Sequence, residues 1–249
     1  MTNHEFLVIA PARHIAERFF PSVSVDRHLH SEILGGIHTL REEALRETAA
    51  SDKQSAAAAH HFHVLDRSSW HVVLRSACQR VVGCARYRQI AGGFEEFRAS
   101  ESAIARSTRY GPMLKDSFEK LVAGVRQRGK EYGEAGGWAL RPEVRGTTAG
   151  FNVALMTYAL AEHLGSGLAV TTATRLNQSA SILRRIGARR LSGLPGYYEP
   201  EFSSVMEIVH FDLPCLNTLY ASKLQSLQQV LTKLRVVCAG PASTRTSVV

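Results

Sequence analysis

The stretch RPEVRGTTAGFNVAL, residues 141–155, decides how the rest of the chain is interpreted. It begins with charged residues, passes through a turn of small residues and continues as an apolar segment. The first N–H groups of a helix have no partner within it, and the helix dipole places partial positive charge there. A turn of glycine and threonine lets an anion approach these groups closely. The stretch therefore predicts a strand that leads into a buried helix whose beginning can hold a phosphate.

The residues of this turn supply suitable groups. The arginine offers a planar fork for phosphate oxygens, and the two threonines offer hydroxyl donors. The glycine spacing is neither that of a dinucleotide fingerprint nor that of a P-loop, so a plain turn capped by threonine is the alternative interpretation. The candidate phosphate-binding residues are Arg145, Gly146, Thr147, Thr148, Ala149 and Gly150.

Strand and helix patterns alternate on both sides of the turn. Strands are predicted at 4–11, 61–66, 70–76, 80–90, 135–142, 168–174 and 204–213. Helices are predicted at 28–48, 94–130, 148–164, 177–187, with Asn177 as the N-terminal cap, and from Pro214 to 234. The first half favours antiparallel pairing, and the strand–helix crossovers of the second half favour parallel pairing. We therefore expect an α/β fold with a mixed central sheet flanked by helices, in one domain over 1–238 with a disordered tail at 239–249.

The composition is that of an ordinary globular protein. The chain has 249 residues, of which 45% are hydrophobic and 21% charged, which is enough for one large core. No apolar run is long enough to span a bilayer, and the first residues lack the pattern of a signal peptide, so a cytoplasmic location is expected. The four cysteines form no close pair and are expected to be reduced.

The formal net charge of +8 points to an acidic partner, such as nucleic acid, anionic lipid, a phosphorylated cofactor or an acidic protein. A charge that serves solubility alone is the other interpretation. Nucleic-acid binding ranks last, because no basic strand is interleaved with aromatic residues and no recognition helix is evident.

Two kinds of chemistry find little support in the sequence. His61 and His63 would share one face of a strand, but no acidic or cysteine partner has matching spacing, so no metal site is predicted. There is no Gly-x-Ser-x-Gly elbow for a serine nucleophile.

The segment from 136 to 191 resembles the core of the GNAT acyltransferase superfamily. In that family a strand leads into an Arg/Gln-x-x-Gly-x-Gly/Ala turn that binds the pyrophosphate of an acyl-CoA. Arg145 matches the first position and Gly150 the last, while Thr148 replaces the middle glycine. Asn177 matches a later family segment that flanks the pantetheine arm. The resemblance implies no permanently bound cofactor, with acyl-phosphopantetheine or acyl-CoA as co-substrate.

A closer branch is also indicated. RVVGCARYR (80–88) and GPMLKDSF (111–118) resemble the autoinducer (acyl-homoserine lactone) synthases, and VMEIVHFDLP (205–214) resembles the long-chain N-acyl amino acid synthases. Both branches take the acyl chain from acyl carrier protein, whose thioester arm carries a single phosphate. The resemblance implies transfer of a long-chain acyl group from acyl carrier protein to an amino acid or similar small amine. An acetyl-CoA-dependent N-acetyltransferase is the alternative, and an autoinducer synthase a more remote one.

Amide formation from a thioester requires an amine that loses a proton, a polarised carbonyl and close positioning. The autoinducer branch carries a Glu-x-x-Arg segment, and here Glu134 is present while Gly137 stands where arginine would be. This departure favours an acceptor other than the homoserine-lactone precursor. Glu134 is the candidate base, directly or through a water, and a solvated strand-end glutamate is the alternative.

The resemblance assigns further roles around Glu134. It implies that backbone groups of Trp138, Ala139 and Leu140 bind the pantetheine and polarise the thioester carbonyl, with the Trp138 side chain in the core. Arg86 matches a family arginine, which implies that it faces the carboxylate of the acceptor; an arginine on an exposed strand with no such role is the alternative. Acyl carrier proteins are acidic, so a basic surface on the donor side would steer docking, unless it is merely a solvated face. The arginines concerned are Arg184, Arg185, Arg189 and Arg190.

Overall fold

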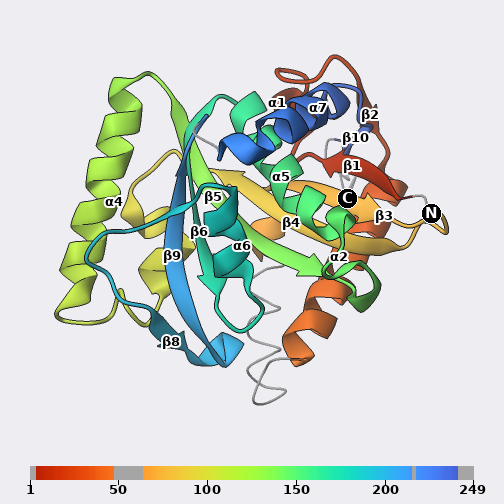
Figure 1. Cartoon of the computed structure of the whole chain (residues 1–249). Coiled ribbons are helices and arrows are strands. Elements are labelled where there is room, and N and C mark those ends of the chain that lie inside the picture. Colours follow the sequence, from red (N-terminus) through yellow and green to blue (C-terminus); the bar gives the residue numbers. More distant parts are fainter. Residues whose placement is uncertain (1–3, 48–63, 215–216, 241–249) are drawn as a thin grey trace, which may run out of the picture.

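Ten strands form one sheet within residues 4–47, 64–214 and 217–240, which the computed structural model describes (Figure 1). Their order across the sheet is β2-β10-β1-β3-β4-β5-β6-β9-β7, and β8 also pairs with β9. The strands are β1 (Glu5–Ile9), β2 (Val23–Val25), β3 (Trp70–Arg75), β4 (Val81–Gln89), β5 (Glu131–Leu140), β6 (Ser166–Thr174), β7 (Arg189–Arg190), β8 (Tyr197–Glu199), β9 (Ser204–Asp212) and β10 (Val236–Cys238).

Helices cover both faces of this sheet (Figure 1). They are α1 (Arg13–Ala16), α2 (Arg27–Arg46), α4 (Tyr110–Gln127), α5 (Thr148–His163), α6 (Ser179–Ile186) and α7 (Ala221–Leu231), with short 3-10 turns η1 (Phe94–Glu96), η2 (Arg98–Glu101), η3 (Pro142–Val144), η4 (Pro200–Phe202) and η5 (Thr218–Tyr220). Helix α5 is apolar nearly all round because it lies between the sheet and α7. Helix α2 instead buries one stripe that includes Ile33 and Ile37.

The core has three clusters that define two faces. The first cluster lies on what we call the α5 face, with α5, α6 and α7 over the sheet. The other two lie on the opposite side, the α2 face, where α2 covers β1, β3 and β4 and α4 covers β6 and β9. Alternate residues of each strand point to opposite faces. On β9, for example, Val209 belongs to the α5-face cluster and Ile208 to the α2 face.

Strand directions confirm a mixed sheet and correct one detail. Strands β1, β3, β4 and β5 pair antiparallel, and β5 pairs parallel with β6 after the α5 crossover, as expected. Strands β6 and β9 are antiparallel, so the expectation of parallel pairing is wrong there. The connection between them passes through α6, β7 and β8 and enters β9 at the far end of β6.

The contact between β5 and β6 covers less than half of β5. The parallel ladder runs from Glu131 opposite Ser166 to Glu134 opposite Val170. Beyond it β6 continues against β9 alone, and β5 continues against β4 alone. Figure 1 shows the two strands diverging from this point. Residues 135–140 of β5 therefore form an edge without a strand partner on the β6 side.

A bulge interrupts the other side of the same segment of β5. Gly136 lies opposite Arg86, and Ala139 lies opposite Cys84, so two residues of β5 face one residue of β4. The first of the two, Gly137, has a φ of +57°, a conformation that suits glycine. After the bulge, the alternation of side chains between the two faces is shifted by one residue. Trp138 therefore packs against the α5-face cluster, and Ala139 packs on the α2 face.

Several predicted elements differ from those observed. Residues 64–66 are helical and not part of a strand, while 61–63, with His61 and His63, lie outside the described residues. The helix predicted at 94–130 begins only at Tyr110, after two 3-10 turns. Pro214 does not start the last helix but follows β9 in a turn, and α7 begins at Ala221.

Other expectations fall partly outside the described ranges. Cys78, Cys84 and Cys238 are free thiols, whereas Cys215 and residues 241–249 of the tail are outside them. Within the described residues, none of the helices has the length and hydropathy that a membrane crossing requires.

Candidate functional site

The unpartnered edge of β5 leads directly to the N-terminus of α5. Helix α5 begins at Thr148, and Thr147 caps it by accepting a bond from the Gly150 N–H at 3.4 Å. The hydroxyl of Thr147 also donates to the carbonyl of Val144 at 2.8 Å. The N–H groups of Thr148 and Ala149 have no acceptor among the described residues. The first turn of α5 thus keeps free donors of the kind that bind phosphate.

The two glycines of this turn have different tasks. Gly146 has a φ of +71°, and nothing lies within 4 Å of a Cβ added to it. Its task is therefore the left-handed backbone conformation of the turn and not a close contact. A Cβ on Gly150 would lie 2.7 Å from the carbonyl oxygen of Val144 and 2.8 Å from a methyl group of Leu140. Gly150 therefore lets the beginning of α5 pack closely against the end of β5.

Arg145 is engaged by protein groups in this arrangement. Its Nε donates to the carbonyl oxygen of Leu140 at 2.9 Å, and its Nη1 lies 2.6 Å from the carboxylate of Glu47 at the end of α2. The side chain is 41% exposed. An anion at the start of α5 would therefore compete with Glu47 for the guanidinium of Arg145.

The three β5 residues implied to bind pantetheine lie at or after the bulge. Ala139 is buried, Leu140 is half-buried and Trp138 packs against the α5-face cluster, as expected for its side chain. The indole N–H of Trp138 is buried and has no acceptor among the described residues. A buried donor without an acceptor is uncommon, and it lies on the strand whose edge is open.

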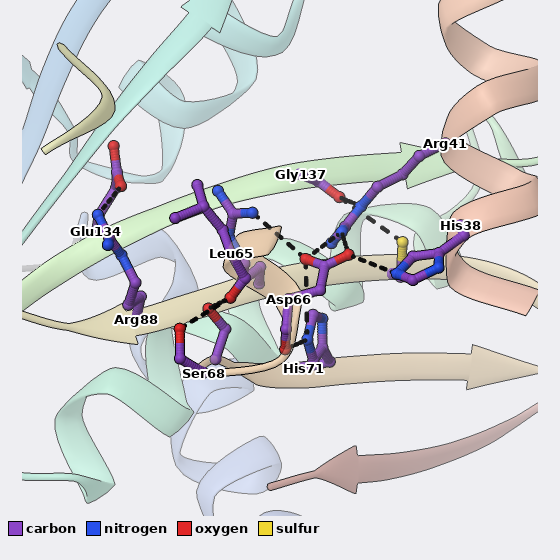
Figure 2. Close-up of polar contacts among 12 residues, drawn as sticks. His38, Arg41, Leu65, Asp66, Ser68, His71, Arg88, Glu134 and Gly137 are labelled. Carbon is purple, nitrogen blue, oxygen red and sulfur yellow. Dashed lines mark hydrogen bonds and ion pairs between the residues drawn. The ribbon is translucent and has the colours of Figure 1, made fainter. Parts of the chain in front are cut away.

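On the α2 face, Asp66 organises a buried ionic network (Figure 2). The carboxylate accepts from Nη1 of Arg41 at 2.6 Å and from Nη1 of Arg86 at 3.3 Å. Nε2 of His38 lies 3.2 Å from the same carboxylate. Nε2 of His71 is 3.0 Å from the backbone carbonyl of Asp66. Segments far apart in the sequence, α2, the turn before β3, and β4, are joined by this one side chain.

Burial sets the ionisation states in the network. Burial alone would raise the pKa of Asp66, but Arg41 and the neighbouring groups hold it well below its ordinary value. Burial lowers the pKa of His71 to about 3, so this imidazole is neutral near pH 7. Burial and the charge of Arg41 lower the pKa of Arg86 to about 10, which still leaves it charged. Two guanidinium charges therefore face one carboxylate charge.

Arg41 connects this network to the bulge. Its Nε donates to the carbonyl oxygen of Gly137 at 2.9 Å (Figure 2). A Cβ on Gly137 would lie 2.5 Å from Nη2 of Arg41, so no side chain fits at position 137 while Arg41 is in place. The guanidinium of Arg41 thus occupies the space next to the position where the autoinducer branch has its arginine.

Glu134 lies on the same face at the end of the β5–β6 ladder. It is not a solvated strand-end glutamate, because it is 4% exposed. Its Oε2 accepts from Arg88 at 3.1 Å, and its Oε1 accepts from the backbone N–H of Arg98 at 2.8 Å. Burial raises the pKa of Glu134, against the opposing effects of Arg86 and Arg88. A carboxylate with a raised pKa is suited to accepting a proton near neutral pH.

Arg86 and Asn177 have surroundings that the sequence did not indicate. Arg86 is 2% exposed and paired with Asp66, so its contact with an acceptor carboxylate stays a prediction. Asn177 is exposed in the loop between β6 and α6, and it does not cap the helix. The N-cap position is occupied by Gln178, which has a left-handed backbone with a φ of 57°. Its side chain accepts no hydrogen bond from the first N–H groups of the helix.

Sequence reasoning missed Arg41 and Asp66. A signal for Arg41 was available, since it follows Ile33 and Ile37 at intervals of four and so falls on the buried stripe of α2. A charge on such a stripe requires a buried partner. Asp66 had no comparable signal, because the segment around it was predicted to be a strand.

The basic residues near α6 are mostly paired. Arg184 and Arg190 engage Glu207, and Arg189 lies 3.7 Å from Asp212. Within the described part of the chain, no three His, Cys, Asp or Glu side chains gather in a metal-binding arrangement.

Solved structures with a similar fold were found, although no family model and no curated protein sequence matches the chain. The CoA-dependent acyl-homoserine lactone synthase BjaI, with SAM and isopentyl-CoA, has a TM-score of 0.53 at 14% identity, over 96% of this chain and 95% of that structure. FeeM, an N-acyl amino acid synthase from uncultured soil microbes, has a TM-score of 0.51 at 9% identity, over 94% and 99%. An agmatine N-acetyltransferase has a TM-score of 0.50 at 14% identity, over 84% and 100%. The protein therefore has the GNAT fold.

Proposed function

We propose that the protein is an N-acyltransferase that moves an acyl group from a phosphopantetheine thioester to the amine of an amino acid or similar small amine. One observation carries the proposal. The β5–β6 ladder ends at Glu134, and the open edge of residues 135–140 continues from there to the free N–H groups of α5. An extended arm with a phosphate at one end can pair with such an edge and reach those donors.

The two faces of the sheet would then have different roles in the reaction. On the α5 face, the first turn of α5 would bind the phosphate and the Trp138 indole would donate to a carbonyl of the arm. On the α2 face, Glu134 would take the proton from the amine as nitrogen attacks the thioester carbon. The thiolate of the carrier leaves as the amide forms.

An acceptor with a carboxylate fits the charges of the α2 face. Arg41, Arg86 and Arg88 bring three positive charges, and Asp66 and Glu134 bring two negative ones. Homoserine-lactone synthesis is less favoured, because Gly137 stands where the autoinducer branch has its arginine. The remaining positive charge supports an anionic acceptor such as a free amino acid.

For the donor, we propose long-chain acyl carrier protein, with acyl-CoA as the second candidate. The second candidate is supported by BjaI, which is described as CoA-dependent and has the same fold. Acyl carrier protein brings one phosphate to α5, and the replacement of the middle glycine of the turn by Thr148 suits this smaller group.

The test is to incubate the purified protein with a mixture of amino acids and one donor at a time. The donors are long-chain acyl carrier protein, the matching long-chain acyl-CoA, and acetyl-CoA. Mass spectrometry should detect an N-acyl amino acid with the long-chain donor. Product from acetyl-CoA alone would contradict the long-chain proposal, and no acylated amine from any donor would contradict acyl transfer to amino acids.

A further inference from the structure

A second polar site lies on the α5 face, away from the open edge of β5. It is a pocket of about 450 Å³ between α6, β7 and β9. Glu207 lies on this face because it alternates along β9 with Val209 and Phe211 of the α5-face cluster. The lining residues are Arg175, Gln178, Ala180, Ser181, Arg184, Arg190 and Glu207.

One buried carboxylate holds three guanidinium groups in this pocket. The Glu207 side chain is 3% exposed, and Nε of Arg175 donates to its Oε1 at 2.7 Å. Arg184 donates to Oε2, and Nε of Arg190 lies 3.5 Å from the same oxygen. The three arginines come from the loop after β6, from α6 and from β7, so the carboxylate fixes their positions relative to one another.

The arginines exceed the charge of Glu207 by two. Among the described residues that line the pocket, Glu207 is the one acidic side chain. The arginine side chains remain 40–51% exposed, so each presents N–H groups that the carboxylate does not use. Gln178 and Ser181 add neutral hydrogen-bonding groups at the beginning of α6.

We propose that this pocket binds a phosphate monoester. Such a group carries about −1.5 to −2 charge at pH 7, which matches the excess of two, whereas a carboxylate would neutralise half of it. Guanidinium forks bind phosphate oxygens in pairs, and three forks held at fixed positions limit the ordering cost of binding. The volume leaves room for more than the phosphate group, so the pocket also admits the phosphate monoester of a larger molecule.

Two sources supply this chemistry, namely the ribose 3′-phosphate of CoA and a free phosphorylated metabolite. Neither Glu134 nor the open edge lines the pocket, so the inference goes beyond the proposed acyl transfer.

The test is calorimetric titration of the full-length protein with inorganic phosphate, CoA and 3′-dephospho-CoA. Arg184→Gln and Arg190→Gln should each weaken phosphate binding at least tenfold. Arg185→Gln and Arg189→Gln are the matched controls, since these neighbouring arginines do not line the pocket, and they should change it less than twofold. Preference of the wild type for CoA over 3′-dephospho-CoA, lost in Arg190→Gln, identifies CoA as the source. Equal affinity for the two, with phosphate binding retained, identifies a free metabolite.

Glu207→Gln tests whether this carboxylate positions the three arginines. Its loss should weaken phosphate binding severalfold, because the guanidinium groups would no longer be held at fixed positions. If the arginines served only to hold Glu207 in place, neither the wild type nor any of these variants would bind phosphate. Absence of phosphate binding in the wild type, or an equal loss in the control variants, would overturn the proposal while leaving acyl transfer untouched.

Discussion

Two buried carboxylates on the α2 face have opposite electrostatic environments. Asp66 accepts from two guanidinium groups and its pKa is held low, whereas burial dominates at Glu134 and raises its pKa. Carboxylates whose surroundings move their pKa values apart commonly have different tasks. We therefore propose that Asp66 holds the buried arginines in place and that Glu134 accepts the proton of the amine.

Glu134→Gln should lower kcat by about 10²- to 10⁴-fold with little effect on KM for the donor, as expected for loss of a general base. The acidic limb of the pH–rate profile should also disappear, because the limb reports protonation of Glu134. Steady-state kinetics between pH 5 and 9 would measure both effects.

Glu131→Gln is the matched control, since Glu131 is exposed on the same strand. It should keep the wild-type rate and profile. An unchanged acidic limb in Glu134→Gln would show that another group titrates.

Asp66→Asn should lower the free energy of unfolding by about 3–5 kcal/mol, because Arg41 and Arg86 would lose their buried counter-charge. Urea unfolding followed by circular dichroism measures this quantity. Asp116→Asn removes the exposed Asp116–Lys120 pair and should cost less than about 1 kcal/mol. Equal losses in the two variants would mean that the network contributes little.

His71 should make stability dependent on pH. Its pKa is about 3 in the folded protein and about 6.5 in an unfolded chain, so below pH 6.5 the unfolded state binds a proton that the folded state does not. The free energy of unfolding should therefore fall by up to about 1.4 kcal/mol per pH unit as the pH drops from 6.5 toward 5. His71→Gln should flatten this slope, whereas replacement of the exposed His14 should not.

At the scale of elements, the bulge in β5 connects the two faces of the sheet. Gly137 adopts the left-handed conformation and receives the guanidinium of Arg41 on its carbonyl oxygen. Gly137→Ala should destabilise the protein by at least about 1 kcal/mol through the backbone alone. It should also lower activity, because the added methyl group displaces Arg41.

Gly35→Ala provides a control of opposite sign. Gly35 lies inside α2 with nothing within 4 Å of the added methyl group, so alanine should stabilise the helix by up to about 1 kcal/mol. Thermal unfolding of both variants checks the pair. If Gly137→Ala instead raised the stability of the protein, the bulge would change its conformation without a cost in free energy.

The long elements were predictable and the short ones were not. Helix α2, strands β3, β4 and β6, and the start of α5 after the turn follow from apolar spacing and turn residues. Strands β2, β7, β8 and β10 have two or three residues each, which is too short for a periodic pattern. These short segments form strands because a neighbouring strand has unpaired backbone groups. The sequence alone does not show which strands are neighbours.

At the scale of the whole molecule, the order of strand and helix patterns predicted the mixed sheet, and the resemblance to the GNAT family drew attention to the backbone of residues 138–140. It did not predict the Asp66 network, since Arg41, Asp66 and Arg86 are separated in the sequence by 25 and 20 residues and meet only in the fold. The assignment of Glu134 as a base and of Arg86 to the acceptor stays a prediction.

The net charge of +8 leads to a prediction about the donor. If acyl carrier protein docks through complementary charge, kcat/KM for it should fall at least about fivefold when salt rises from about 25 to about 250 mM. Turnover of an acyl-CoA with the same chain should fall less, because the smaller donor has fewer charges to screen. Equal salt dependence for both donors would argue against steering by the protein surface.

Strand β10 has a consequence for how the protein is made. Residues 236–238 lie between β1 and β2 and pair parallel with both, so a segment near the end of the chain joins two segments near its beginning (Figure 1). Until the ribosome has released residue 238, β1 has an open edge and β2 lacks the strand it pairs with. A nascent chain would therefore expose this edge from the time β1 is made until β10 is made, and during that time the edge can pair with other chains.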